Sequence, residues 1–311
     1  MIVIDSEKVK RRVKMELQRK TPPIIQAAAW MLGTLLSFSL MAIAVRELSP
    51  EISTFQMLTV RSAIGLVIVM ILLHRTGWGQ ITGRHLKLHL ARNVVHLVGH
   101  LGWLYAIAFL PLATVFSIEF TVPLWTALLA TAFLGEQLNA TRIAAILLGL
   151  SGVLVILRPG TESIHPAALG MLGGALAYSI AYIVTRKLAA DVSPLSILFY
   201  MMGIQFLLSL APCLTMWVDP TPVQWTWLTI IGLTVLSGHY CVTKALQLAE
   251  ATVIVPMDFV RLPLIAVVGA LFYGEQPDVF LVAGALLIIV ANSVNIHRER
   301  AEAMRPCPFE K

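Results

Sequence analysis

The sequence predicts an all-α integral membrane protein with ten transmembrane helices in two inverted five-helix repeats. Three observations lead to this prediction. The chain of 311 residues is 58% hydrophobic and only 13% charged, whereas soluble domains are about 25% charged and could not hide so much apolar surface in a core. Apolar runs of roughly 20 residues, the length that spans a bilayer, recur along the chain. Residues 31–48 return, in similar form, as residues 171–188.

The expected helices are the apolar runs that charge, Pro or Gly interrupts. The first run is longer than the apolar core of a cleavable signal peptide, so we interpret it as the first span. The fifth run is short, and the joins at Pro111 and Glu250 leave almost no loop. The expected spans are 24–45, 53–73, 90–110, 112–134, 143–157, 168–186, 195–217, 225–248, 252–273 and 279–297.

The distribution of Lys and Arg predicts the orientation. With a cytoplasmic N-terminus, the inner connections carry 17 of these residues and the outer connections carry two, Arg46 and Arg158. Positive residues concentrate on the cytoplasmic side of membrane proteins, so both termini are expected to be cytoplasmic. The net charge of +6 therefore reflects topology. Anionic lipid explains the basic N-terminal segment far better than nucleic acid does.

The repeat also predicts the domain organisation. A basic tail over residues 1–23 precedes one repeat over 24–158 and a second over 159–297, and residues 298–311 form a C-terminal tail. Each repeat has five helices, an odd number, so the second must enter the membrane from the opposite side. Such a design can expose a central site to either face in turn. Two complete halves also remove the need for an obligate protein partner.

Two acidic residues occupy matching positions inside apolar spans. Glu119 and Asp258 are 139 positions apart, and each should lie roughly 10 Å deep at 1.5 Å per residue. A carboxylate at that depth is costly unless it is paired or hydrated, so such residues usually face a cavity. The alternative is a structural ion pair, in which Asp258 bonds Arg261 and Glu119 meets a basic residue of another helix. Pro123 frees the Glu119 carbonyl from its helix, which indicates either cavity-lining backbone or a simple kink.

Polar and aromatic side chains recur at spacings of three and four in the third and eighth expected helices, and two tyrosines share a face of the sixth. Such faces should not point at lipid, so we expect them to line a central cavity. The alternatives are interhelical hydrogen bonds for the histidines and packing against lipid for the aromatic residues. The residues expected to contact substrate are Glu119, Asp258, His100, Trp103, Tyr178, His239, Tyr240 and Lys244.

Three further charged residues have structural interpretations. Arg61 lies deep in the second span, where the alternatives are that it neutralises a carboxylate or bonds carbonyls between helices, and a structural role is expected. Glu136 and Glu275 belong to matching Gly-Glu-Gln motifs at helix ends, where capping or loop locking explains them. No metal is expected, because His96 and His100, one turn apart, lack a convincing third ligand.

Residues 106–159 resemble the second half of the EamA repeat of the drug/metabolite transporter superfamily. They begin AIAFLPLATVFSIEFTVPLWTALLATAFLGEQL and end GLSGVLVILRP, and residues 245–275 resemble this pattern more loosely. The similarity covers about residues 24–297 and is greatest to ten-helix bacterial amino-acid exporters of the YddG type. The resemblance implies a carrier in the bacterial inner (plasma) membrane that has no bound cofactor and exports small metabolites through a central cavity.

We therefore expect export of amino acids, neutral and aromatic ones first. Carboxylates suit the ammonium group, Lys244 or Arg92 suits the carboxylate, and the aromatic residues suit the side chain. The alternative substrates on this scaffold are cationic drugs or a vitamin or nucleotide-like metabolite, which acidic and aromatic groups also attract.

The sequence also bears on enzyme activity and on the energy source for transport. The common hydrolase and metalloprotease motifs are missing, so an enzyme is not expected, and a sensor without flux stays a minor alternative. The chain has no phosphate-binding loop of the Walker type, so ATP is not expected to drive transport. Glu119 or Asp258 could exchange protons, which leaves proton coupling and facilitated transport as alternatives.

Overall fold

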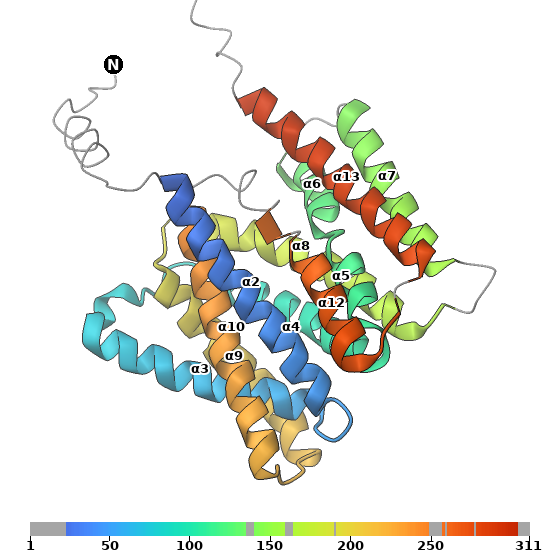
Figure 1. The fold of residues 1–311 in the computed structure, drawn as a ribbon. Coiled ribbons are helices and arrows are strands. Elements are labelled where there is room, and N and C mark those ends of the chain that lie inside the picture. The colour runs from blue at the N-terminus through green and yellow to red at the C-terminus, as the bar shows by residue number, and fades with distance from the viewer. Residues whose placement is uncertain are drawn as a thin grey trace, which may run out of the picture.

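The computed structural model describes residues 23–134, 140–158, 164–189, 191–248, 257–258, 260–276 and 278–303. Regular structure in these residues is entirely helical, as expected, and helix occupies part of each of the ten expected spans. The elements are α2 (Pro23–Leu48), α3 (Thr54–Thr76), the 3-10 turn η1 (Trp78–Gln80), α4 (Leu86–Phe109), α5 (Leu112–Glu119), α6 (Val122–Leu134), α7 (Ala140–Leu157), α8 (Pro166–Ala189), α9 (Pro194–Thr215), α10 (Pro222–Leu248), α12 (Arg261–Tyr273) and α13 (Val279–Ala303). The start of α2 and the end of α13 lie at the same end of the molecule (Figure 1).

Serine residues start two helices at matching positions of the repeat. The side chain of Ser53 accepts a hydrogen bond from the backbone N–H of Gln56 at 3.2 Å, and Ser193 accepts one from Ser196 at 3.2 Å. Both are N-caps, at the first turn of α3 and of α9. An N-cap of this kind satisfies a backbone N–H that the helix leaves unpaired. The duplicated sequence therefore sets the same boundary twice.

The expected single span over 112–134 is wrong in one respect, because a break at Phe120 and Thr121 divides it into α5 and α6. Pro123 has no N–H to donate to the Glu119 carbonyl, so the helical ladder cannot continue past that point. Glu119 is therefore the last residue of α5. In the second half, residues 257–258 are helical, Val260 is in a turn and α12 starts only at Arg261, so Asp258 also lies just before an interruption.

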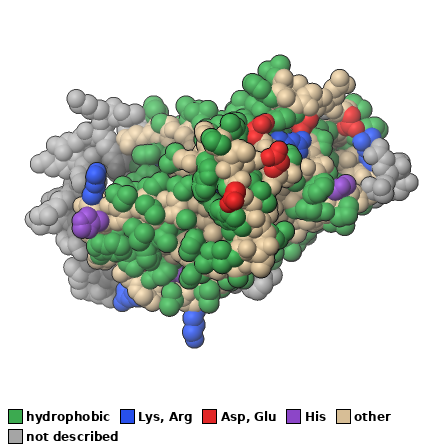
Figure 2. All heavy atoms as spheres, turned by 90° about the horizontal axis from the view of Figure 1, so that it is seen from below, with side chains coloured by type: hydrophobic (Ala, Val, Ile, Leu, Met, Phe, Trp, Pro, Cys, Tyr) green, Lys and Arg blue, Asp and Glu red, His purple; other side chains and the backbone are tan. Residues whose placement is uncertain are grey.

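The helices have the length and the surface of a membrane protein. Among the described residues, four helices are long and apolar enough to cross a bilayer, namely Ile25–Leu48, Thr54–Thr76, Pro166–Thr185 and Pro194–Thr215. Shorter apolar helices accompany them. Large apolar side chains are strongly exposed on the outside, with Leu271 and Phe272 each 75% exposed. Figure 2 shows hydrophobic atoms over most of one face, an arrangement that suits contact with lipid rather than water.

Helices of the first half pack mainly on helices of the second half. The most extensive pairs are α2 with α10, α7 with α13, α4 with α8 and α3 with α9, and α5 packs on α12. The first two pairs run side by side in Figure 1. In the order of the repeat, the first helix packs on the eighth and the third on the sixth, so the pairing is reciprocal between the halves.

Matching glycines bring two of these pairs into close contact. A Cβ added at Gly99 would lie 2.8 Å from the ring of Tyr178, and one added at Gly238 would collide with the ring of Phe38. Gly99 joins α4 to α8 as Gly238 joins α10 to α2, and Phe38 and Tyr178 are equivalent positions of the repeat. Without side chains at these glycines, the helices approach closely, as in many membrane bundles. The rings thereby reach the histidine that follows each glycine.

Candidate functional site

The two predicted acids meet in the interior around one arginine. The Nη2 of Arg261 donates to Oδ2 of Asp258 at 2.7 Å and to Oε1 of Glu119 at 3.1 Å. The Nε1 of Trp103 donates to the other Glu119 oxygen, Oε2, at 2.8 Å. The Arg261 side chain is 5% exposed, against 16% for Glu119 and 25% for Asp258. The ion pairs considered as the structural alternative therefore form, and they join acids from both halves of the chain.

Local sequence places these groups together. The break after Glu119 ends α5 beside the start of α12, where Arg261 is the first helical residue. Three aromatic rings surround its guanidinium, with centroids 4.9 Å (Phe116), 5.5 Å (Phe38) and 5.8 Å (Phe120) from Cζ. Aromatic faces attract a cation and exclude water from it. One oxygen of Asp258, Oδ1, is buried and has no hydrogen-bond partner among the described residues, so this carboxylate has an acceptor that they leave unused.

A band of stacked rings extends from this cluster along α4. The His100 ring stacks on Trp103 at a centroid distance of 5.4 Å, and its Nδ1 lies 3.0 Å from the Tyr178 hydroxyl of α8. His96 stacks on His100 at 6.1 Å and lies 5.5 Å from His239 of α10. We call this set of rings the aromatic band; its members are His96, His100, Trp103, Tyr178 and His239. It joins α4, α8 and α10 in the interior.

The aromatic band ends at a buried glutamine and a second arginine. Gln205 of α9 places its Nε2 2.9 Å from Nδ1 of His96, and its Oε1 accepts from Nη2 of Arg61 at 2.6 Å. Arg61 is 1% exposed and Gln205 is 0% exposed. The expected interhelical bond of Arg61 is therefore present. Polar contacts and stacked rings run without interruption from α3, through α9 and α4, to Glu119 of α5 and to Asp258.

Six of the eight expected site residues belong to this connected set, and Tyr240 and Lys244 lie in another group. The Tyr240 ring meets Trp30 of α2 edge-on at 5.9 Å, and the Lys244 ammonium lies 5.6 Å from the Tyr240 centroid. Both residues are on α10, like His239, but no contact joins them to the aromatic band among the described residues. We therefore place them beside the site rather than within it.

His96 and His100 do not converge on a common metal position. Their rings are stacked face to face with an interplanar angle of 11°, and each uses Nδ1 toward another side chain, Gln205 or Tyr178. No group of three His, Cys, Asp or Glu side chains is arranged to hold a metal within the described part of the chain.

A second charged cluster forms at the junction of α4 and α5. Arg46 forms an ion pair with Oε1 of Glu275 and donates to the carbonyls of Ile107 and Leu110, the latter at 2.9 Å. The other Glu275 oxygen accepts from the backbone N–H of Leu112 at 2.8 Å. These contacts satisfy carbonyls at the end of α4 and a free N–H at the start of α5. We name these residues the Arg46–Glu275 cluster. Glu275 therefore caps the start of α5, while Glu136, the matching acid, lies outside the described residues.

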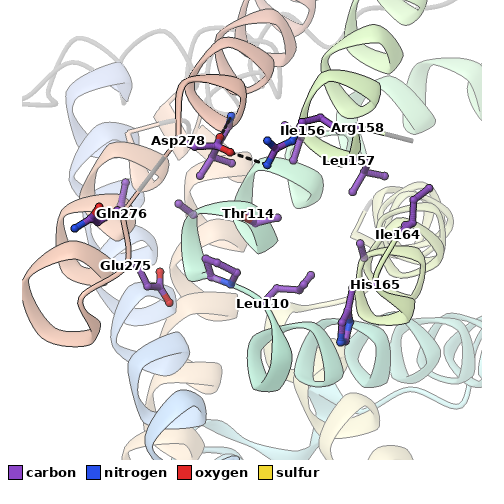
Figure 3. Close-up of a pocket in the computed structure, with 15 residues that line it drawn as sticks. Leu110, Thr114, Ile156, Leu157, Arg158, Ile164, His165, Glu275, Gln276 and Asp278 are labelled. Atoms are coloured by element: carbon purple, nitrogen blue, oxygen red, sulfur yellow. Dashed lines mark hydrogen bonds and ion pairs between the residues drawn. The ribbon is translucent and has the colours of Figure 1, made fainter. Parts of the chain in front are cut away.

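A cavity of about 300 Å³ opens next to the Arg46–Glu275 cluster. Its wall includes Glu275, Thr114, His165 and the ion pair between Arg158 and Asp278. The Nη2 of Arg158 lies 2.7 Å from Oδ2 of Asp278. Figure 3 shows Glu275 and His165 on different sides of the hollow, with the Arg158–Asp278 pair at another edge. The cavity does not include the expected site residues. Helix α5 connects the two regions, because Leu112 and Glu119 are about 10 Å apart along its axis.

We expect replacement of Arg46 by methionine to loosen the start of α5. The change removes the ion pair and leaves two carbonyls at the end of α4 with one fewer donor, at a cost of about 1–3 kcal/mol in the free energy of unfolding. Thermal denaturation in detergent measures that loss. A cysteine at Thr114, in a background without natural cysteines, should then react faster with a membrane-impermeant thiol reagent. Unchanged reactivity would show that the cluster does not hold α5.

Sequence reasoning missed how central Arg261 is and underestimated Glu275. The symmetry of the repeat singles out Glu119 and Asp258, but position 122, the counterpart of Arg261, is a valine, so no duplication signals the arginine. Its spacing of three from Asp258 was the available signal. For Glu275, the acid after a helix end was visible, but its partner Arg46 lies 229 positions away, and no periodicity reports such a contact.

Buried acids, arginines and stacked histidines inside a helical membrane protein are typical of proteins that provide a polar pathway across the bilayer. The EamA-like transporter family matches residues 25–158 and 165–295. The chain belongs to this family, and is thus a membrane transporter.

Several characterised proteins are similar over most of their length. An S-adenosylmethionine uptake transporter of Rickettsia prowazekii is 24% identical over 89% of this chain and 94% of its own. A pseudopaline exporter of Pseudomonas aeruginosa is 28% identical over 82% and 90%, and a riboflavin transporter of Vibrio cholerae is 27% identical over 86% and 91%. One crystal structure shares the fold with a TM-score of 0.65 and 17% identity, over 89% of this chain and 98% of that one.

Proposed function

We propose that this transporter carries small zwitterionic solutes across the membrane, with amino acids as the first class to test and export as the direction. The observation that supports this most directly is the pair of carboxylates at Glu119 and Asp258, which Arg261 holds together next to stacked rings. A solute ammonium group could replace Arg261 in part or take up the free Oδ1 of Asp258. The aromatic band offers flat surfaces to an apolar side chain.

The transport cycle that we propose is alternating access between two inverted halves in a bacterial inner membrane, with both termini in the cytoplasm. The reciprocal helix pairing supports it, because a two-fold relation between the halves produces pairs of this kind. The bias of 17 inner to two outer basic residues supports the orientation. In this orientation the Arg46–Glu275 cluster lies on the outer side, and α5 carries its movement to Glu119.

A solute with a larger ring system is the second candidate. The His100–Trp103 stack provides a surface for a vitamin, a nucleotide-like metabolite or a cationic drug, and two of the similar proteins carry S-adenosylmethionine and riboflavin. S-adenosylmethionine has both an amino-acid group and a flat ring, so it satisfies both candidates chemically.

Flux into proteoliposomes tests the proposal. Radiolabelled phenylalanine, threonine and methionine are offered with and without a pH gradient, and radiolabelled S-adenosylmethionine and riboflavin are offered in separate assays. Flux of amino acids that others compete away supports the first candidate, and its response to the gradient decides whether protons are coupled. Folded protein that moves no amino acid, while the ring-containing solutes are carried, moves the assignment to the second candidate.

Replacing Glu119 by glutamine or Asp258 by asparagine is expected to slow amino-acid flux by about tenfold to a hundredfold. A hydrogen bond to a charged group contributes about 1.5–3 kcal/mol to binding. Each substitution removes the charge of the carboxylate but keeps the size of the side chain. Asp191→Asn is the matched control, because that side chain is exposed at a loop and should leave flux unchanged. Wild-type rates in both interior variants would exclude the acids from transport.

A further inference from the structure

Arg61 is a buried cation whose donors are mostly unused. Its residue is 1% exposed, and its one hydrogen bond within the described residues is from Nη2 to the neutral amide of Gln205. Its Nε and Nη1 are buried and have no hydrogen-bond partner in the part of the chain that the structure describes. None of the ion pairs among the described residues includes it. A charge in a low-dielectric interior is strongly destabilising unless an opposite charge compensates it.

Other arginines of the same protein show what a structural role looks like here. Arg46 bonds a carboxylate and two backbone carbonyls. Arg261 bonds two carboxylates and lies against three aromatic rings. Both are therefore compensated by groups of the chain itself. Arg61 has no such surroundings, because its one bonded partner among the described residues is the neutral amide of Gln205.

The position of Arg61 connects it to the candidate site. Gln205 bonds Arg61 on one side and His96 on the other, so one side chain separates the guanidinium from the aromatic band. The acids Glu119 and Asp258 lie at the other end of that band, beyond Trp103. The connected set thus carries an uncompensated positive charge at one end and carboxylates at the other.

We propose that Arg61, assisted by Gln205, is the subsite that binds the carboxylate of the transported solute. This inference rests on the proposed function, because it assumes a solute that carries a carboxylate. The solute carboxylate receives hydrogen bonds from the unused guanidinium donors, the strong charge-assisted kind that arginine forms with carboxylates. Gln205 accepts from Nη2 and so orients the guanidinium. Its amide is uncharged, so the positive charge of Arg61 remains available to the solute carboxylate.

The first experiment uses sodium formate alone as the probe, so that it reads the subsite whichever solute the protein carries. The thermal stability of the purified full-length protein in detergent is measured with formate up to about 100 mM, a range in which a weak ligand stabilises by mass action. A bulky sulfonate holds the ionic strength constant. Formate should raise the melting temperature of the wild type. An unshifted wild type overturns the proposal.

Three variants make the assignment specific. Arg61→Gln should lose the formate shift. Gln205→Glu should lose it too while melting no lower than the wild type, since it supplies an internal carboxylate 2.6 Å from Arg61 Nη2 at the position of the present amide oxygen. Arg75→Gln is the control, because it removes an exposed guanidinium from the same helix as Arg61, and it should keep the shift. A full shift in Arg61→Gln, or a strongly destabilised Gln205→Glu, contradicts the subsite.

A second measurement separates this inference from the proposed function. Binding of phenylalanine is compared with binding of phenylalanine amide, which lacks the carboxylate. The wild type should prefer phenylalanine by about tenfold or more, and Arg61→Gln should bind both equally. If neither ligand binds but the formate shift still depends on Arg61, the amino-acid assignment fails and the anion subsite stands. Equal preference for phenylalanine in both proteins places the carboxylate elsewhere and overturns the subsite.

Discussion

Replacing Arg261 by glutamine is expected to abolish transport and to lower the free energy of unfolding by about 3–5 kcal/mol. The two acids that it joins would then face each other in the interior without a counter-charge, while Trp103 alone still donates to Glu119. Breaking a buried pair from one side costs more than removing the whole pair, because the remaining charge stays buried. Flux in proteoliposomes and thermal denaturation in detergent measure the two effects.

A fully neutral version of the cluster serves as its control. The triple variant Glu119→Gln, Asp258→Asn and Arg261→Gln leaves no unpaired charge among these residues, so it should regain most of the lost stability and still fail to transport. This result would assign the charges to transport rather than to folding. A single Arg261→Gln variant that melts like the wild type and carries solute at the wild-type rate would contradict the role of the cluster.

Replacing Gly102 by valine is expected to destabilise the protein by several kcal/mol, because α4 and α8 have no room for a side chain there. A Cβ at Gly102 would collide with the backbone carbonyl of Gly170, which cannot rotate away as a side chain could. The two helices would have to separate, and Tyr178 would then lose contact with His100. Thermal denaturation and solute flux should therefore both decline.

Gly173→Ala is the matched control for the Gly102 variant. It lies on α8, one of the same two helices, and a Cβ there would have no neighbour within 4 Å. Because alanine also favours helix over glycine, this variant should be as stable as the wild type or slightly more so. Equal melting temperatures for Gly102→Val and the wild type would mean that α4 and α8 do not pack as described.

The helical class and most helix positions follow from the sequence because lipid imposes a simple rule. A segment that crosses a bilayer must satisfy its backbone internally and cover itself with apolar side chains, and both demands leave long apolar runs. The break in the fourth span was partly predictable from the sequence, since Pro123 leaves the Glu119 carbonyl without its helical N–H donor. What the proline could not show is that the interruption ends α5 completely rather than bending it.

The candidate site could be predicted less completely, because its contacts join distant parts of the chain. The repeat identified Glu119 and Asp258 as a pair, and the spacing of polar residues placed His100 and Trp103 on one face of α4. Neither signal reports which helix lies opposite. Gln205 therefore received no role at the site, although its two bonds connect Arg61 to His96. Tyr240 shares α10 with His239 but packs on Trp30, and Lys244 lies near the Tyr240 ring, since helical periodicity fixes a face only approximately.

The reciprocal pairing of the halves has a consequence for how the protein is made. Helix α2 packs most extensively on α10, and α4 on α8, so the early helices enter the bilayer before their partners have been translated. About 200 residues separate α2 from the end of α10, which corresponds to roughly 10–40 s at 5–20 residues per second. In the same way, 144 positions separate Arg61 from Gln205 and 142 separate Glu119 from Arg261, so each charge is made well before its partner. A nascent chain that stalls after its first half therefore displays unpaired charges within the bilayer, a signal by which membrane quality control can distinguish it from the finished protein.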